Sequence, residues 1–177
     1  MLKRIAVFPG SFDPITIGHV NIVRRAAPLF DKIIIALGNN SSKKYFFTLE
    51  QRQKWIEKIF KDLKKVEVVA YQGLTVNFVK KMKGNYILRG IRNAADFDYE
   101  KTIAQLNKSM DPELETICII SDPEMTHISS TIVREIMING GDVSKFVPSE
   151  VNLSKIRDTR HKTQDKNGKE LKVKSKK

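Results

Sequence analysis

The sequence predicts a single α/β domain with a five-stranded parallel sheet, and three observations support this prediction. Five short apolar runs recur along the chain, at residues 4–8, 32–37, 66–71, 85–89 and 116–121. The segments between these runs carry apolar residues at helical spacing. The runs themselves are nearly continuous in Ile, Val and Leu, which is typical of strands buried on both faces. Strict alternation of strand and helix favours right-handed crossovers, so we expect a doubly wound, Rossmann-like sheet.

Five apolar stripes indicate the helices that accompany these strands, and we expect each stripe to face the core. In chain order the stripes are Val20, Val23, Ala27 and Phe30; Leu49, Ile56, Phe60 and Leu63; Val76 and Val79; Tyr99, Ile103, Leu106 and Met110; and Ile132, Ile136 and Met137. Thr48 and Gln51 open the second helix with the spacing of a capping box. Gly140 and Gly141 follow the fifth helix and favour its end there.

Length and composition indicate a soluble protein of the cytoplasm. The chain has 177 residues, of which 41% are hydrophobic. No apolar run approaches the roughly 20 residues that span a bilayer. The N-terminus enters a strand pattern directly, so we expect neither a signal peptide nor a membrane partner. The single cysteine, Cys118, excludes an internal disulfide, and its apolar surroundings in the sequence favour a buried, inert thiol over a catalytic one.

The net charge of +12 is concentrated near the C-terminus. Residues 151–177 hold ten Lys/Arg and three Asp/Glu, which accounts for +7 of that total. We therefore expect one domain over residues 1–157 and a basic tail over residues 158–177. The tail has too few apolar residues to offset its ordering entropy, so disorder is expected. It could touch nucleic acid or a membrane surface, but a solvated appendage is favoured and no nucleic-acid partner is expected.

The residues that follow the strand runs predict a phosphate-binding site. In a parallel sheet, ligands bind beyond the carboxyl ends of the strands. Gly10 follows the first run and lets the backbone approach an anion closely. His19 falls in the first turn of the next helix, whose N-terminus attracts negative charge. The other candidates at strand ends are Ser11, residues 39–44, residues 73–75, residues 89–92 and residues 129–131.

Two of these strand ends are basic. Lys43 and Lys44 lie in a polar loop, where a lysine pair is often only solvated, although its place at a strand end favours a role in the site. The segment Arg89-Gly90-Ile91-Arg92 is predicted to put two guanidinium groups on one short turn. Arginine forks match phosphate oxygens bidentately. The alternative is that the two arginines form surface ion pairs with Asp96 or Asp98.

Three further features each leave two interpretations open. Ordinary N-capping explains one hydroxyl of Ser129-Ser130-Thr131, whereas three hydroxyls in a row indicate a second phosphate-receiving helix N-terminus. Glu100 lies off the apolar stripe of its helix, so it is either a solvated carboxylate or a hydrogen-bond acceptor near the site. His127 could line the site, although a lone loop histidine usually has no special role.

The candidate residues offer cations and phosphate-cradling backbone but no pair of nucleophile and base. Ser11 could be activated by His19, yet no carboxylate is placed by motif to orient that histidine. Phosphoryl-type transfer needs chiefly positioning and charge stabilisation. No metal-ligand cluster appears at zinc spacing, so protein side chains are expected to hold no metal. A Mg²⁺ ion held mainly by phosphates would leave little trace in the sequence.

Four segments together resemble the bacterial-type phosphopantetheine adenylyltransferase family. The stretch from Pro9 to His19 resembles the H-x-G-H type signature of a wider nucleotidyltransferase superfamily, with Thr16 in the place of the first histidine. The narrower match rests on the segments Ser42 to Arg52, Arg89 to Glu100 and Ile128 to Glu135. The resemblance covers roughly residues 2–157.

The resemblance implies transfer of the adenylyl group of ATP to 4′-phosphopantetheine, giving 3′-dephospho-CoA and pyrophosphate, the penultimate step of coenzyme A synthesis. It also implies Mg²⁺ as a companion of ATP and a homohexamer, a dimer of trimers, as the assembly. His19 would stabilise the transition state, with Lys43 and Arg92 also in catalytic positions. Phosphopantetheine would be held by Ser11, Lys43, Thr75 and Arg89. ATP would be surrounded by Ser11, Phe12, His19, Gly90, Ile91, Arg92, Glu100, Met125, Thr126, His127, Ile128, Ser129, Ser130 and Thr131.

Two alternatives stay open at this point. A relative with the same chemistry could act on another phosphorylated acceptor, such as nicotinamide mononucleotide, or could transfer a cytidylyl group. The Arg-Gly-Ile-Arg segment favours phosphopantetheine over these. A nucleotide- or nucleic-acid-binding module without catalysis would explain the basic charge, but it would not explain an H-x-G-H type loop together with paired arginines.

Overall fold

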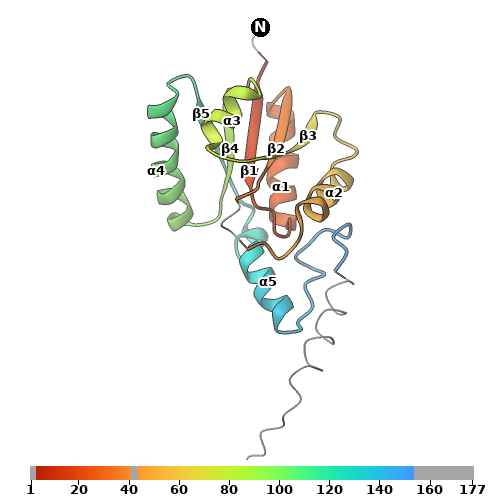
Figure 1. Cartoon of the computed structure of the whole chain (residues 1–177). Helices are drawn as coiled ribbons and strands as arrows, with labels where there is room; N and C mark the ends of the chain where they lie inside the picture. Colours follow the sequence, from red (N-terminus) through yellow and green to blue (C-terminus); the bar gives the residue numbers. More distant parts are fainter. Residues whose placement is uncertain (1–2, 41–43, 154–177) are drawn as a thin grey trace, which may run out of the picture.

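The computed structural model describes residues 3–40 and 44–153, and these residues form one parallel sheet flanked by helices (Figure 1). The sheet has five strands in the order β3-β2-β1-β4-β5. Their bounds are β1 Ile5–Gly10, β2 Lys32–Gly38, β3 Val66–Tyr71, β4 Tyr86–Ile91 and β5 Glu115–Ile120. The predicted fold class and all five predicted strand runs are confirmed. The chain crosses from one half of the sheet to the other between β3 and β4, which places β1 and β4 side by side at the switch point.

The helices of the described residues are α1 Ile17–Ala26, α2 Leu49–Ile59, α3 Thr75–Lys81, α4 Ala94–Met110 and α5 Ser130–Ile138, with short 3₁₀ turns η1 Ala27–Leu29 and η2 Pro123–Met125. The capping box predicted for the second helix is present, because Thr48 and Gln51 exchange side chain-to-backbone hydrogen bonds. The stripes predicted for α1, α2 and α3 contribute buried residues to the core, as expected.

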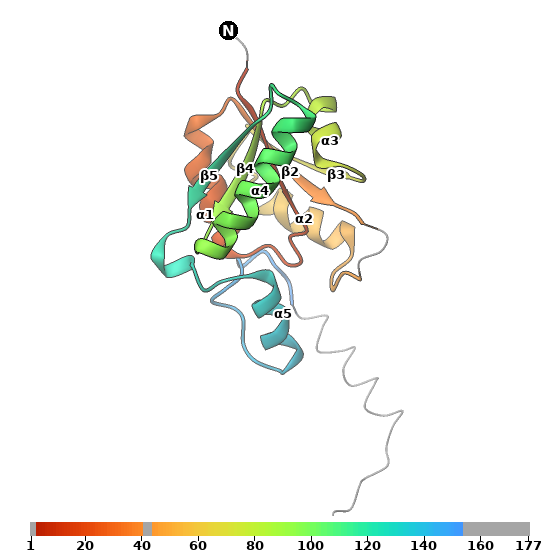
Figure 2. The same ribbon diagram turned by 90° about the vertical axis from the view of Figure 1, so that its left-hand side faces the viewer.

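The central strands β1, β2 and β4 are buried on both faces, which explains why they read as continuous apolar runs, whereas the edge strands β3 and β5 contain no buried residue. On β1, Ala6 and Phe8 belong to a core that includes residues of α1 and α2. The residue between them, Val7, belongs to a second core with Val76 and Val79 of α3. Helix α4 packs against β4 and β5, on the face of the sheet that α3 also covers (Figure 2).

The stripe predicted for α4 does not face the core, and that prediction is wrong. Tyr99, Leu106 and Met110 are exposed, with 54% of Leu106 accessible. The residues that α4 buries are the polar Glu100 and Asn107. Apolar residues at helical spacing identify a face of the helix, but they do not say what covers that face. On α5, Ile132 is likewise exposed, whereas Val133 and Met137 are buried.

Cys118 is exposed, so the prediction of a buried thiol is also wrong. The reason is that β5 lies at the edge of the sheet, where the residues of an apolar strand are covered on fewer sides. Desolvation and, second, the charge of Glu100 raise the pKa of the thiol. A raised pKa keeps the thiol protonated and weakly nucleophilic.

Helix α5 and the segment that follows it lie beyond the carboxyl ends of the strands (Figures 1 and 2). Val143, Val147 and Val151 of this segment are buried in the core that includes α1. The backbone N–H of Ile17 donates to the carbonyl of Phe146 at 3.1 Å. The domain therefore extends at least to residue 151, and the predicted tail over residues 158–177 lies outside the described residues. Within the described part of the chain, no helix combines the length and apolar character needed to cross a membrane.

Candidate active site

Two adjoining cavities open at the carboxyl ends of the strands, where the sequence predicted a site. One, of about 700 Å³, is lined by Thr75 among others, and we call it the Thr75 cavity. The other, of about 320 Å³, is lined by His19, and we call it the His19 cavity. Pro9, Gly10, Ser11, Arg89 and Glu100 line both cavities. Ligands in the two cavities would therefore meet at this shared wall.

Most of the residues predicted to surround a nucleotide line the His19 cavity. They are Ser11, Phe12, His19, Gly90, Arg92, Glu100, Met125, Ile128, Ser129, Ser130 and Thr131. Three predicted residues do not line either cavity: Ile91 is buried, Thr126 bonds back to Pro123, and His127 packs edge-on against Phe146. The N-termini of α1 and α5 thus approach one cavity from two sides, an arrangement suited to an anion.

His19 is held in a capping box at the start of α1. Its Nδ1 accepts a hydrogen bond from the backbone N–H of Thr16 at 3.0 Å and lies 2.8 Å from the Thr16 hydroxyl oxygen. In return, the Thr16 hydroxyl accepts from the backbone N–H of His19. Since Nδ1 is an acceptor, the proton of a neutral ring must lie on Nε2. Thr16, in the place of the first histidine of the motif, therefore selects the tautomer of His19.

The electrostatics of the cavity keep His19 neutral. Desolvation, followed by the charges of Arg92 and Arg89, lowers the pKa of His19 from 6.5 to about 4. A histidine with this pKa holds no proton to give away as an acid near neutrality. Its Nε2–H is instead a fixed hydrogen-bond donor, which suits a contact to a phosphate oxygen.

The lowered pKa of His19 predicts a pH-dependent stability. The unfolded chain takes up a proton near pH 6.5 and the folded chain only near about pH 4. The contribution of His19 is therefore fully present above the higher value and is lost as the pH falls between the two. Denaturant unfolding of the wild type and of His19→Gln across this interval measures it. The wild type should lose more stability than the variant, and equal losses would contradict the assignment.

Gly10 also has a structural role, because the ring of Phe12 occupies the space above it. A Cβ atom on Gly10 would lie 2.9 Å from that ring. Phe12 itself is buried, has a left-handed backbone with φ of 45°, and packs edge-on against His19 with ring centroids 5.2 Å apart. Gly10 therefore permits a local fold that braces His19 from one side.

Each of the two predicted arginines is paired with a carboxylate. Arg89 forms a bidentate pair with Glu100, with Nε donating at 2.7 Å, and its Nη1 donates to the carbonyl of Pro9 at 2.9 Å. Arg92 pairs with Asp96, and the hydrogen bonds that Arg92 donates lower the pKa of the Asp96 carboxyl. The ion-pair alternative is thus confirmed for Arg92, yet both arginines also line the His19 cavity.

One detail of the arginine segment differs from the prediction, and the structure decides between the two interpretations of Glu100. Strand β4 continues to Ile91, so Arg89 lies within a strand and not on a turn. Its side chain points to the face covered by α4, which brings it to Glu100. Glu100 is buried and accepts hydrogen bonds, so it is not a solvated carboxylate. A Cβ atom on Gly90 would lie 3.0 Å from Ile22, so Gly90 makes room for α1.

The three hydroxyls at the start of α5 have separate partners. Ser129 caps the helix by accepting from the backbone N–H of Ile132. Ser130 donates to the carbonyl of Pro14 at 2.7 Å, and Thr131 accepts from Arg134. Arg134 also donates to the carbonyl of Asp13 at 2.5 Å. Capping therefore explains one hydroxyl, Ser130 holds α5 against the loop before α1, and Thr131 contacts this loop only through Arg134.

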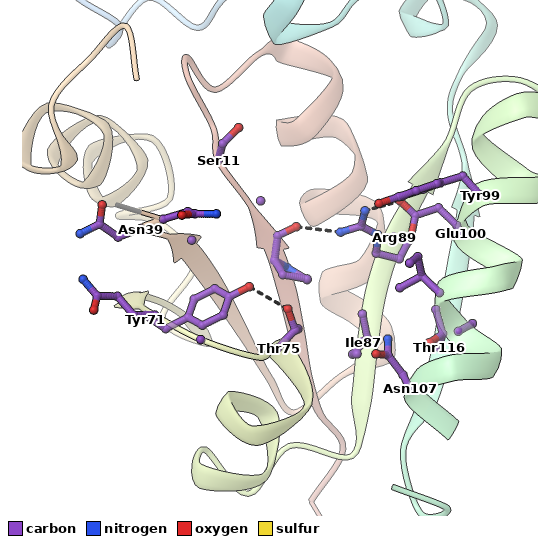
Figure 3. A pocket seen from close by; sticks show the side chains of 18 of the residues that line it. Ser11, Asn39, Tyr71, Thr75, Ile87, Arg89, Tyr99, Glu100, Asn107 and Thr116 are labelled. Atoms are coloured by element: carbon purple, nitrogen blue, oxygen red, sulfur yellow. Dashed lines mark hydrogen bonds and ion pairs between the residues drawn. The ribbon is translucent and has the colours of Figure 1, made fainter. Parts of the chain in front are cut away.

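The Thr75 cavity is lined from both halves of the sheet (Figure 3). On one side the hydroxyl groups of Tyr71 and Thr75 lie 2.8 Å apart. On the other side lie Arg89 and, further along α4 and β5, Asn107 and Thr116. The loop after β2 contributes Asn39 and Asn40. Of the two predicted lysines of this loop, Lys43 lies outside the described residues, and Lys44 is exposed and lines neither cavity.

Comparison with known proteins decides which family has this site. The family model described as "Cytidylyltransferase-like" matches residues 7–136. A Flavobacterium johnsoniae protein named phosphopantetheine adenylyltransferase is 49% identical over 152 residues, which is 86% of this chain and 99% of the relative. A Bdellovibrio bacteriovorus protein with the same name is 45% identical over 85% of this chain and 94% of its own.

The chain belongs to the phosphopantetheine adenylyltransferase family. The predicted family and enzyme class, a nucleotidyltransferase, are confirmed. A solved Vibrio parahaemolyticus structure, provisionally described as a nicotinate-nucleotide adenylyltransferase, has a TM-score of 0.64 at 18% identity, covering 84% of this chain and 89% of that one. At this identity the likeness shows the fold alone.

Two residues that line the Thr75 cavity were not predicted from the sequence. Asn107 is buried yet polar and faces the Thr75 cavity, and Tyr71 pairs with Thr75. Asn107 lies four residues after Ile103 and therefore on the same face of α4. A polar residue on that otherwise apolar face was the only feature of the sequence that could have indicated it. Among the described residues, no group of three His, Cys, Asp or Glu side chains could hold a metal ion.

Proposed function

We propose that this adenylyltransferase transfers the adenylyl group of ATP to 4′-phosphopantetheine, giving 3′-dephospho-CoA and pyrophosphate, the penultimate step of coenzyme A synthesis. The observation that carries the proposal is the pair of cavities joined at Ser11 and Arg89. Two phosphate-bearing substrates bound in these cavities would bring their reacting phosphates together at the shared wall. The names of relatives that match over nearly their whole length identify the substrates.

The proposed reaction is a direct displacement. A phosphate oxygen of phosphopantetheine bonds to the α-phosphorus of ATP, while the bond from that phosphorus to the bridging oxygen breaks and pyrophosphate leaves with the electron pair. The attacking phosphate is already ionised, so no general base is needed. Catalysis then rests on alignment and on stabilising the charge that develops on the α-phosphate. The neutral Nε2–H of His19 is the donor we assign to that charge.

We assign ATP to the His19 cavity. The N-termini of α1 and α5 would face its phosphates, and Arg92 would contribute positive charge. Phe12 and Gly90, together with Met125, Ile128, Ser129, Ser130 and Thr131, would surround the rest of the nucleotide. We assign Mg²⁺ to ATP itself, as MgATP. This fits the cavity, since its carboxylates Asp96 and Glu100 are already paired with arginines.

We assign phosphopantetheine to the Thr75 cavity. Its phosphate would lie at Ser11 and Arg89, with Lys43 supplying a second cation from the loop after β2. The pantetheine arm carries two amide groups, which need hydrogen-bond partners when they leave water. The buried side chain of Asn107 and the backbone near Thr75 are suitable partners in the cavity.

A pyrophosphate-release assay tests the proposal. The protein is mixed with MgATP and, in parallel, with phosphopantetheine, nicotinamide mononucleotide or no acceptor. We expect release only with phosphopantetheine, together with dephospho-CoA detected by mass spectrometry. Release only with nicotinamide mononucleotide would reject the proposed acceptor, and replacing ATP by CTP tests the nucleotide in the same way.

We also propose a cytoplasmic homohexamer, a dimer of trimers, with residues 158–177 as an appended basic tail. The exposed apolar face of α4, formed by Tyr99, Leu106 and Met110, supports an assembly because such a face is costly to leave in water. Leu106→Glu should lower the mass measured by light scattering. Leu29→Glu, at a similarly exposed leucine on η1, is the matched control and should not. An unchanged mass for both variants would remove this face from the interface.

A further inference from the structure

Arg52 of α2 is an almost completely buried arginine for which the proposed chemistry has no use. Only 1% of its surface is accessible. Burying a guanidinium group is costly unless its donors find acceptors. The contacts of Arg52 therefore indicate what the group is retained for.

The guanidinium group joins two segments of the site. Its Nη1 donates to the carbonyl of Ser11 at 2.6 Å, and its Nε donates to the carbonyl of Phe47 at 3.2 Å. Its central carbon lies 4.1 Å from the ring centroid of Tyr45, a cation–π distance. One planar group thus holds the loop before α1 against the segment before α2.

Both held segments line the cavities. Ser11 belongs to the wall that the two cavities share. Tyr45 lines the Thr75 cavity, and its hydroxyl donates to the carbonyl of Gly38 while accepting from the backbone N–H of Asn40, both at 2.9 Å. Through Tyr45, Arg52 therefore reaches the loop after β2 as well.

A second set of contacts joins the same two segments in the opposite direction. The buried carboxylate of Asp13 accepts from the backbone N–H groups of Phe46 and Phe47 at 2.8 and 2.9 Å. Asp13 and Arg52 thus hold the two segments together in complementary ways. Asp13 accepts hydrogen bonds from backbone N–H groups, whereas Arg52 donates hydrogen bonds to backbone carbonyls. Of the two, only Arg52 bonds to Ser11, next to both cavities.

We infer that Arg52 is a positioning residue that aligns the two substrates, by holding the Ser11 backbone at a fixed place relative to the loop after β2. This inference rests on the proposed adenylyl transfer. The physical reason is that ATP and its acceptor meet at Ser11 from different segments, so their relative position depends on what joins those segments. A misplacement of about 1 Å between reacting groups is enough to cost as much as about a hundredfold in rate.

The substitution Arg52→Lys tests the alignment while keeping the charge. A lysine has no planar fork and cannot reach both carbonyls in the same way. We expect kcat to fall about tenfold to a hundredfold, while the dissociation constant of each substrate measured alone stays within about threefold, because each keeps its own contacts. Arg24→Lys, at an arginine of α1 paired with Asp62 away from both cavities, is the matched control and should keep kcat.

A rescue experiment separates alignment from general support of the fold. Arg52→Ala is assayed with millimolar methylguanidinium or methylammonium. The additive concentrations are chosen so that the thermal unfolding midpoint of the variant is the same with both cations. We expect methylguanidinium to restore part of kcat and methylammonium to restore none. An unchanged kcat in Arg52→Lys, equal rescue by both cations, or failure of both variants to fold would overturn the inference. Absence of turnover in the wild type would reject the proposed function instead, so the two failures are distinguishable.

Discussion

Replacing His19 by alanine is expected to lower kcat at least about a hundredfold, the usual cost of removing one donor to a developing charge. The neutral Nε2–H of His19 is oriented by Thr16 and so meets the transition state without reorganisation. ATP binding should change little, because the helix N-termini and Arg92 remain. Pyrophosphate release gives kcat, and calorimetry gives the dissociation constant of ATP.

The matched control for this substitution is His127→Ala. His127 is also a histidine of the predicted nucleotide segment, but it lines neither cavity and packs on Phe146. Its replacement should leave kcat within about twofold of the wild type, since it removes no donor from the cavity. Near-normal turnover in His19→Ala would remove His19 from the transition state. An equal loss in both variants would show that the effect is not specific to the cavity.

Replacing Arg89 by methionine is expected to have the second large effect, on both binding and stability. The side chains of Arg89 and Glu100 are 26% and 10% accessible, so the substitution strands a largely buried carboxylate. Breaking a buried pair typically costs about 3–5 kcal/mol, and the partial exposure here places the expected loss near the lower end. The Michaelis constant for phosphopantetheine should rise as well, because its phosphate loses a bidentate partner.

A double substitution separates these two effects. Arg89→Met combined with Glu100→Met removes the stranded charge, so denaturant unfolding should show that most of the lost stability returns. The Michaelis constant for phosphopantetheine should stay raised, because the phosphate contact is still missing. Arg4→Met is the control for losing an arginine from an exposed pair, here with Asp31, and should destabilise the fold far less than Arg89→Met does. A double variant with the Michaelis constant of the wild type would show that Arg89 acts only through the fold.

The architecture of the sheet could be predicted from the sequence because its signals are local. Each strand is a short, largely apolar run, and each of the first three helices begins or packs through residues a few positions apart, as Thr48 and Gln51 do. The position of the site at the strand ends could also be predicted from the sequence, since parallel strands bring their carboxyl ends together. The motif from Pro9 to His19 and the distant segment from Arg89 to Glu100 were sufficient to indicate the family.

Burial and pairing could not be predicted in the same way. The stripe of Leu106 and Met110 on α4 is exposed, and Cys118 lies on an edge strand, because what covers a face depends on elements far away in the chain. Nor did the spacing of residues 89–92 indicate that Arg89 would turn toward Glu100.

The sequence alone therefore determined the class of fold, the order of its elements and the loop that carries His19. Only the tertiary structure decided that burial beside two arginines lowers the pKa of this histidine to about 4, and that two cavities share one wall at Ser11. The physical reason is the separation along the chain of the residues that interact. Helix caps and apolar runs are set by neighbours within a few residues, whereas desolvation, ion pairing and the joining of cavities depend on side chains that meet only after the chain has crossed the sheet.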